Sequence, residues 1–126
     1  MSAHNEIIDY LKSYKELKFN VIFYRNKMTG LKAIEYSQEA KGTAIKNLMN
    51  VYLHKIDVAE KEMNEIEQFV EKNFSGFVRL AMWARYIDCR TYKEVVVFLE
   101  EKGYSYSIDY IRVSILNAIN RYIDTV

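Results

Sequence analysis

Two long stretches of the chain carry apolar residues at alternating spacings of three and four, the repeat of a helix with one apolar stripe. The first stretch runs from about Asn5 to about Met28 and the second from about Thr43 to about Asn73. The stripes consist of Ile7, Tyr10, Tyr14, Leu17, Val21, Tyr24 and Met28, and of Ile45, Met49, Tyr52, Ile56, Ala59, Met63, Ile66 and Val70. Because one helix cannot bury such a stripe by itself, the matched pair predicts a long antiparallel helical hairpin.

The chain has no proline and only four glycines among 126 residues, which disfavours architectures built from strands and turns. We therefore expect an all-α protein in which residues 1–74 form the hairpin, used for oligomerisation or for docking a partner. Thr29-Gly30 predicts the end of the first helix. The segment from Gly30 to Gly42 is long for a connection within a hairpin and carries apolar residues, so we expect it to pack back on the hairpin.

Further apolar residues widen each stripe beyond that of a simple two-stranded coil, so something else must cover the hairpin. These residues are Ile8, Leu11, Ile22, Phe23, Leu48, Leu53 and Phe69. The cover is the C-terminal helices, a second copy of the chain or another protein. A homodimer is the simplest closed arrangement.

Residues 75–126 predict a compact unit of three helices. Ser75-Gly76 breaks the preceding pattern, and the helix that follows is apolar almost all round, with Trp83 expected in its core. Thr91-x-x-Glu94 has the spacing of a capping box at the start of a short helix. Gly103 then allows a left-handed turn. Ser105 or Ser107 caps a last helix whose apolar stripe is Ile108, Ile111, Ile115, Ala118, Ile119 and Tyr122. Two helices joined so tightly predict a helix-turn-helix.

Several short motifs of the second half resemble the ArpU and RinA class of phage transcriptional regulators. They are Arg85-Tyr86-Ile87-Asp88, Thr91-x-x-Glu94-Val95, Gly103-Tyr104-Ser105 and Ala118-Ile119. Regulators of that class end in a helix-turn-helix similar to region 4 of bacterial sigma factors. The resemblance implies that residues 75–126 bind double-stranded DNA, that the protein regulates transcription, with late-gene activation favoured, and that it contacts RNA polymerase.

The docking mode of a helix-turn-helix indicates which side chains would meet the DNA. The first residues of the last helix would reach base edges, which selects Tyr106, Asp109, Tyr110 and Val113, with Asn117 further along the same outward face. Asp109 could accept a hydrogen bond from cytosine, and Val113 could contact a thymine methyl group. Phosphate contacts are expected from Arg90, Lys93 and Arg112, near the beginning of the two helices. The alternative for all eight is an ordinary solvated surface, and for most tyrosines of the chain it is packing in a core or an interface.

Nothing in the sequence indicates catalysis, a metal or a cofactor. His4 and His54 have no cysteine or carboxylate at ligand spacing, the single Cys89 has no nearby base, and no glycine-rich phosphate loop is present. We therefore expect a protein that is not an enzyme. The sequence shows neither a leader nor a long uncharged run, so we expect a cytoplasmic protein without a membrane segment.

The charge of the chain leaves a second function open. The formal net charge is only +1, whereas affinity for phosphates comes chiefly from lysine and arginine. Residues 75–126 contain seven basic and six acidic side chains, so this part of the chain is nearly neutral. With two wide apolar stripes and many tyrosines, the chain could instead be a helical protein-interaction adaptor that binds no DNA.

Overall fold

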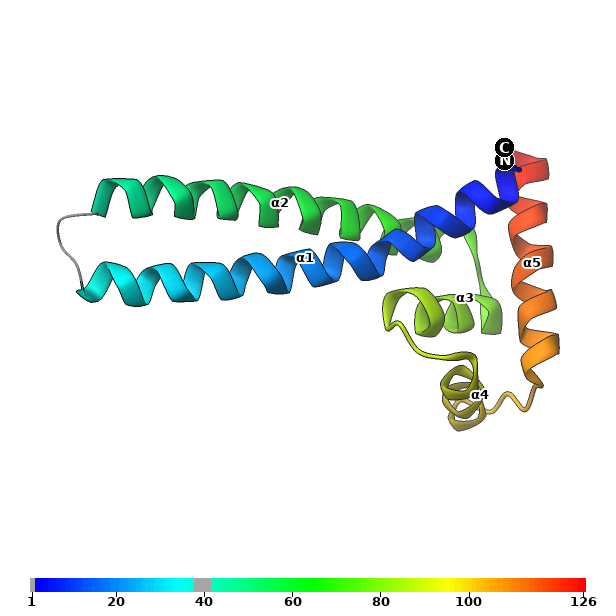
Figure 1. Ribbon diagram of the computed structural model, residues 1–126. Helices are drawn as coiled ribbons and strands as arrows, with labels where there is room; N and C mark the ends of the chain where they lie inside the picture. The colour runs from blue at the N-terminus through cyan, green and yellow to red at the C-terminus, as the bar shows by residue number, and fades with distance from the viewer. Residues whose placement is uncertain (1, 38–41) are drawn as a thin grey trace. The chain divides into compact units, whose positions relative to one another are not determined.

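The structure is a computed structural model that describes residues 2–37 and 42–126, and the regular structure in these ranges is all helical (Figure 1). The elements are α1 (Ala3–Ser37), α2 (Gly42–Asn73), α3 (Gly76–Met82), the π-helical turn η2 (Trp83–Ile87), α4 (Tyr92–Glu101) and α5 (Ile108–Thr125). The predicted all-α class is confirmed. None of the helices in the described ranges has the length and apolar character needed to cross a membrane.

The chain divides into two compact units. The first unit contains Met1–Lys15 and Glu65–Val126, and the second contains Glu16–Asn64. This division passes through both long helices. The reason is that the beginning of α1 and the end of α2 contribute buried residues, among them Leu11 and Val70, to the unit that also holds α3, α4 and α5.

The second unit has a small core in which the two apolar stripes meet. Val21 of α1 is buried together with Ile56 and Ala59 of α2, and four partly buried residues, Leu17, Tyr24, Met28 and Met63, pack against them. Beside this core, Arg25 forms an ion pair with Glu60 at 3.1 Å. The core is narrow, and seven large apolar side chains of this unit stay exposed: Phe19, Ile22, Phe23, Leu48, Val51, Leu53 and Val58.

The predicted end of the first helix at Thr29-Gly30 is wrong, because α1 continues to Ser37. The hydroxyl of Thr29 donates a hydrogen bond to the carbonyl oxygen of Arg25, one helical turn back, at 3.1 Å. A single glycine in a helix interior costs only about 1 kcal/mol relative to alanine, which a long helix tolerates. Most of the predicted connector therefore belongs to α1, and residues 38–41 lie outside the described residues. The second helix, in contrast, occupies the predicted range to within one residue.

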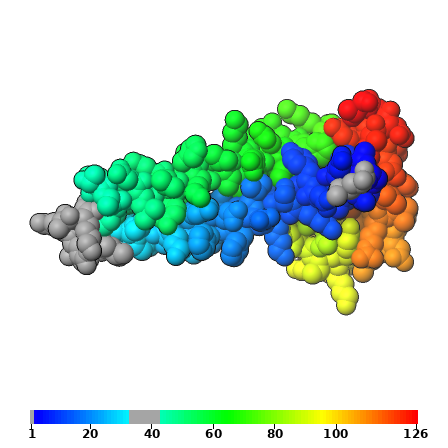
Figure 2. Space-filling view, turned by 45° about the horizontal axis from the view of Figure 1, so that its top comes forward, coloured from blue at the N-terminus to red at the C-terminus, as the bar shows by residue number. Residues whose placement is uncertain are grey.

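The first unit has the larger core, built from both ends of the chain. Its buried apolar residues are Leu11, Tyr14, Ile66, Val70, Phe74, Ala81, Met82, Ala84, Tyr86, Ile87, Val95, Leu99, Ile111, Ile115 and Ile119. The ring of Phe69 lies 5.5 Å from that of Tyr10 and 5.2 Å from that of Tyr122, measured between ring centres. The beginning of α1 and the end of α5 consequently lie side by side, as both views show (Figures 1 and 2).

Trp83 is only partly buried, which corrects its expected place in the core. The residues buried around it are Met82 and Ala84. At this point the helix widens, and the amide of Asp88 donates a hydrogen bond to the carbonyl oxygen of Trp83, five residues back, at 3.0 Å. Because this helix is apolar almost all round, its composition could not show which of its side chains lies toward the surface.

Candidate nucleic-acid interface

The first turn of α4 is closed by the predicted capping box. The hydroxyl oxygen of Thr91 accepts a hydrogen bond from the amide of Glu94 at 3.3 Å, and the carboxylate of Glu94 accepts one from the amide of Thr91 at 3.0 Å. The hydrogen bonds that this carboxylate accepts from the amide and from the hydroxyl of Thr91, with a smaller contribution from Arg90, hold the pKa of Glu94 below its ordinary value. The start of α4 is thereby fixed by its own sequence.

A short turn connects α4 to α5. The carbonyl oxygen of Leu99 accepts a hydrogen bond from the amide of Tyr104 at 2.9 Å, and Gly103 has a φ of 93°, which L side chains rarely adopt. Of the two serines considered for the next cap, Ser107 fills the position, because its hydroxyl oxygen accepts a hydrogen bond from the amide of Tyr110 at 3.1 Å. Ile111 then begins the buried stripe of α5. Helices α3, α4 and α5 contact one another pairwise.

The structure leaves most of the predicted DNA-contacting side chains accessible. Those exposed are Lys93, Asp109, Tyr110, Arg112, Val113 and Asn117, whereas Arg90 and Tyr106 are partly buried. Asp109, Val113 and Asn117 follow one another at intervals of four residues, so they share one outward face of α5. Val113 is 52% exposed although it is apolar and lies two residues from the fully buried Ile111.

Arg112 and Arg85 both lie over the ring of Tyr92, the first residue of α4. Their guanidinium carbons are 4.7 Å and 4.6 Å from the centre of that ring. These are cation–π distances, and such contacts orient a guanidinium without neutralising it. Tyr92 therefore holds two positive charges from different elements beside the amino end of α4.

A second cation of the predicted set, Arg90, also lies over an aromatic ring. Its guanidinium carbon is 4.8 Å from the centre of the Phe98 ring, and the Lys102 ammonium is 5.6 Å from the same centre. The Nε of Arg90 is 3.9 Å from a carboxylate oxygen of Asp88, a long ion pair between two side chains that are each about 40% exposed. Arg90 is thus partly compensated, whereas the ion pairs of the described residues include neither Lys93 nor Arg112.

Four aromatic rings gather at the start of α5, an arrangement that the sequence did not predict. The ring of Phe77, from α3, lies 4.7 Å from Tyr106 and 5.9 Å from both Tyr104 and Tyr110. Tyr106 and Tyr110 are 4.6 Å apart. Two of the residues expected to reach base edges therefore also pack against α3. The signal that could have indicated this is the high density of tyrosines after Gly103, but Phe77 is distant in sequence.

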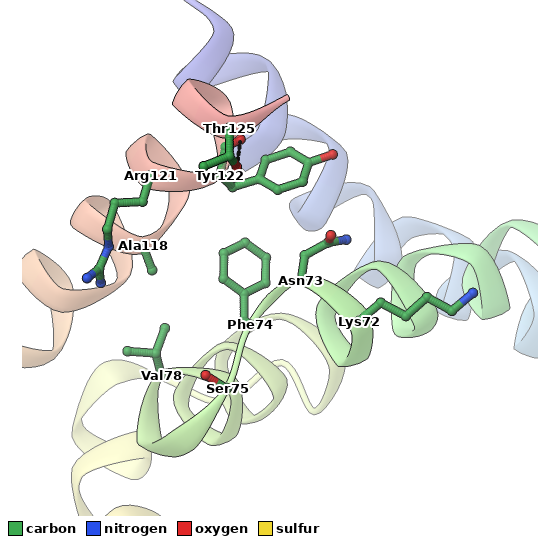
Figure 3. Close-up of a pocket in the computed structure, with 9 residues that line it drawn as sticks. All are labelled: Lys72, Asn73, Phe74, Ser75, Val78, Ala118, Arg121, Tyr122 and Thr125. Atoms are coloured by element: carbon green, nitrogen blue, oxygen red, sulfur yellow. Dashed lines mark hydrogen bonds between the residues drawn. The ribbon is translucent and has the colours of Figure 1, made fainter.

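A pocket of about 420 Å³ lies between the end of α2 and the last turns of α5 (Figure 3). Phe74, Val78, Ala118 and Tyr122 supply its apolar wall, and Figure 3 shows the ring of Phe74 between Tyr122 and Val78. Its other lining residues are Lys72, Asn73, Ser75, Arg121 and Thr125. The pocket contains none of the predicted site residues.

The described residues hold no group of three or more histidine, cysteine, aspartate or glutamate side chains arranged to bind a metal. Cys89 adopts a left-handed backbone conformation with a φ of 57°, and its thiol lies 3.7 Å from the carbonyl oxygens of Tyr86 and Ile87. Burial, followed by the neighbouring Tyr92, raises the pKa of Tyr86 above its usual range. Tyr86 is part of η2, and Cys89 lies in the loop that joins η2 to α4.

Comparison of the chain with protein-family models, with curated proteins and with solved structures finds no match.

Proposed function

We propose that the protein is a sequence-specific regulator of transcription that binds double-stranded DNA, with α4 and α5 as its helix-turn-helix and α5 as the helix that enters the major groove. The observation that carries the proposal is the way α4 and α5 are joined. Both helices begin at a side-chain cap, a left-handed Gly103 lies in the turn between them, and Ile111 buries the inner face of α5. The resemblance to phage regulators of the ArpU and RinA class agrees with this arrangement.

The charges around α4 and α5 support the assignment of phosphate contacts. Lys93 and Arg112 are exposed, and the ion pairs of the described part of the chain do not include them. A cation that is not already neutralised can replace the counterions condensed on a DNA phosphate, and the release of those counterions is the main source of affinity for DNA. The outward face with Asp109, Val113 and Asn117 would then lie toward the base edges.

The second unit would supply dimerisation. Large apolar side chains such as Phe19, at 66% exposure, and Ile22, at 52%, remain accessible beside its narrow core. A second copy of the chain would cover them, and a two-fold dimer would place two copies of α5 on two half-sites of the DNA. The same proposal includes a contact with RNA polymerase, because the helix-turn-helix of the ArpU and RinA class is similar to region 4 of sigma factors.

Selection of duplexes from a random-sequence library tests the proposal, because the cognate sequence is not known in advance. We expect an enriched motif, and we expect binding to the enriched duplex to weaken steeply as salt increases. Specific binding typically exceeds nonspecific binding by a factor of about 10³ or more. Folded protein that is not retained by heparin or by any duplex at low salt would rule out the DNA-binding function.

The second candidate is a helical protein-interaction adaptor. The observation that favours it is the same exposed apolar surface of the second unit, taken together with the net charge of only +1. Under this alternative the aromatic cluster of Phe77, Tyr104, Tyr106 and Tyr110 would contact a protein partner. The salt series separates the two functions, because a largely apolar interface does not weaken as salt rises.

A further inference from the structure

A second pocket of the first unit, of about 250 Å³, is lined by Lys12 and Lys15 of α1, by Arg85 and Tyr86 of η2, and by Cys89. Three of these five side chains are cations and none is a carboxylate. Lys12 and Lys15 are three residues apart, so they project from the same side of α1. The pocket therefore combines two lysines of α1 with Arg85 in a cationic site that the sequence does not predict.

Arg85 lies in this pocket and forms no ion pair with an acidic side chain among the residues that the structure describes. One of its terminal nitrogens donates a hydrogen bond to the carbonyl oxygen of Arg90 at 2.8 Å, and its guanidinium carbon lies 4.6 Å from the ring centre of Tyr92. The ion pairs in the described ranges are Arg25–Glu60, Arg79–Glu71 and Arg90–Asp88, and they leave out all three cations of the pocket. The carboxylate nearest to Arg85 along the chain, that of Asp88, is the one paired with Arg90.

Like charges that share a small cavity repel one another, and an anion bound between them removes that repulsion. A phosphate group matches the set, because a guanidinium presents a fixed fork of donors and two ammonium groups add charge from the side. The half-buried Arg85 loses little conformational freedom on binding, since Tyr92 and the Arg90 carbonyl already orient it. The pocket therefore has the composition of a phosphate site.

Tyr92 connects this pocket to the candidate nucleic-acid interface. The same ring that orients Arg85 also orients Arg112, one of the expected phosphate contacts on α5. We propose that Lys12, Lys15 and Arg85 bind a backbone phosphate of the DNA duplex, next to the phosphates contacted through Arg112 and Lys93. The inference rests on the proposed function, and it makes α1 a part of the DNA-binding surface.

Paired charge-removing substitutions test the inference. Lys12→Gln with Lys15→Gln removes two cations from the pocket and leaves Arg85 and its contacts in place. Lys46→Gln with Lys61→Gln removes two exposed lysines of the second unit and is the control for net charge. Each lost phosphate contact lowers the slope of log affinity against log salt by about 0.9, which at 0.1 M salt corresponds to roughly an eightfold loss of affinity. We expect this loss for cognate and unrelated duplexes alike, and only in the first variant.

Cys89 supplies an independent readout, because it is the only cysteine of the chain and lines the same pocket. Iodoacetamide is uncharged, so its rate of reaction with Cys89 reports access to the thiol rather than attraction by the cations. A duplex phosphate in the pocket should slow the alkylation of the wild-type protein at least several-fold. In the Lys12→Gln, Lys15→Gln variant the same duplex should protect Cys89 much less.

The outcomes separate this inference from the proposed function. If the wild-type protein binds duplex while the pocket variant keeps its affinity, salt slope and Cys89 protection, the phosphate site is wrong and the helix-turn-helix function stands. If no duplex binds, the proposed function fails, and the pocket is then tested with inorganic pyrophosphate. Thermal stabilisation that is lost only in the pocket variant would support a phosphate site for a free ligand, and its absence would overturn the site altogether.

Discussion

The side chains of Thr91 and Glu94 exchange hydrogen bonds with each other's backbone amides, at 3.3 Å and 3.0 Å, and so complete the first turn of α4. The carboxylate of Glu94 also accepts a hydrogen bond from the Thr91 hydroxyl at 3.0 Å. A helix start has amide groups without partners inside the helix, and here two of them are satisfied reciprocally. The position of α4, and of the side chains at its amino end, depends on this pair.

Thr91→Ala should lower the free energy of unfolding by about 1 kcal/mol, the typical cost of removing an N-cap side chain. Urea denaturation followed by circular dichroism measures this change. Thr91→Ser keeps the accepting oxygen and is the matched control, which should lose much less. Equal destabilisation by both substitutions would mean that the methyl group of Thr91, rather than its hydrogen bonds, stabilises α4.

The same residues show what the sequence could predict. A capping box involves two side chains three positions apart within one helical turn, so the spacing of Thr91 and Glu94 was sufficient to locate it. The turn at Gly103 could also be predicted from the sequence, because a left-handed backbone conformation depends mainly on the residue that adopts it. Gly30 failed as a stop signal because its small cost is outweighed by the rest of a helix of 35 residues.

Contacts between distant segments were beyond sequence reasoning. Arg85 and Arg112 both lie over the ring of Tyr92 because η2, α4 and α5 pack together. The spacing of these residues in the sequence does not predict that packing. Lys12 and Arg85 line the same pocket because α1 passes close to the end of η2, which the sequence does not predict either. The aromatic contact of Phe77 with Tyr106 also joins separate elements. The sequence therefore predicted which residues belong to the candidate site. The side chains that contact these residues, and the cationic pocket, are known only from the structure.

Alkaline pH should destabilise the first unit through Tyr14. Burial, and then the neighbouring carboxylate of Glu67, raises the pKa of this phenol from 10.0 to about 12. Between these values the unfolded chain releases the proton while the native chain retains it, so stability falls as pH rises. Two pKa units correspond to a loss of at most about 3 kcal/mol, which is complete only above the higher of the two pKa values.

Tyr14→Phe removes this ionisation and should make the loss of stability above pH 10 shallower. Denaturation midpoints of both proteins from pH 8 to pH 11.5 provide the measurement. The difference between them at pH 8 is the internal control for any change in packing. Parallel curves over the whole range would show that Tyr14 ionises as easily in the folded protein as in the unfolded chain.

The two faces of α5 should respond oppositely to truncation. Ile111 is fully buried, and Ile111→Ala should cost about 2 to 5 kcal/mol of stability, because it removes buried methyl groups and leaves a cavity. Val113 is 52% exposed, and Val113→Ala should change stability by about 0.5 kcal/mol or less. Thermal or urea unfolding compares the two variants. A larger effect at Val113 would mean that the outward face of α5 is covered by another part of the assembly.

Self-association should depend on the exposed apolar side chains of the second unit. Phe19→Ser with Ile22→Ser replaces two of them and leaves the core residue Val21 unchanged. If a second copy covers this surface, light scattering coupled to size-exclusion chromatography should show a dimer for the wild-type protein and a monomer for the variant. A wild-type protein that is monomeric at tens of micromolar would contradict dimerisation through this unit. Arg25→Gln, at a solvated ion pair, is a suitable control.

Removing a phosphate contact and removing a base contact should change DNA binding in different ways. Arg112→Ala and Lys93→Ala each remove an exposed cation that takes part in none of the ion pairs found in residues 2–37 and 42–126. Each should weaken binding to every duplex and reduce the salt slope by about 0.9. Val113→Ser instead changes a side chain of the outward face of α5 and should chiefly reduce the preference for the selected site, by about 1 to 3 kcal/mol.

Val113 is a cleaner probe of base contact than Tyr110, because the Tyr110 ring also packs on Tyr106 and Phe77 and its loss would disturb that cluster. Lys93 is likewise cleaner than Arg112, whose guanidinium lies over Tyr92. Affinities for the selected and for a scrambled duplex, each measured over a salt series, give both quantities for every variant. If Val113→Ser and Lys93→Ala both leave affinity, preference and salt slope unchanged, α5 does not read DNA in this orientation. The adaptor function would then account better for the exposed face of α5.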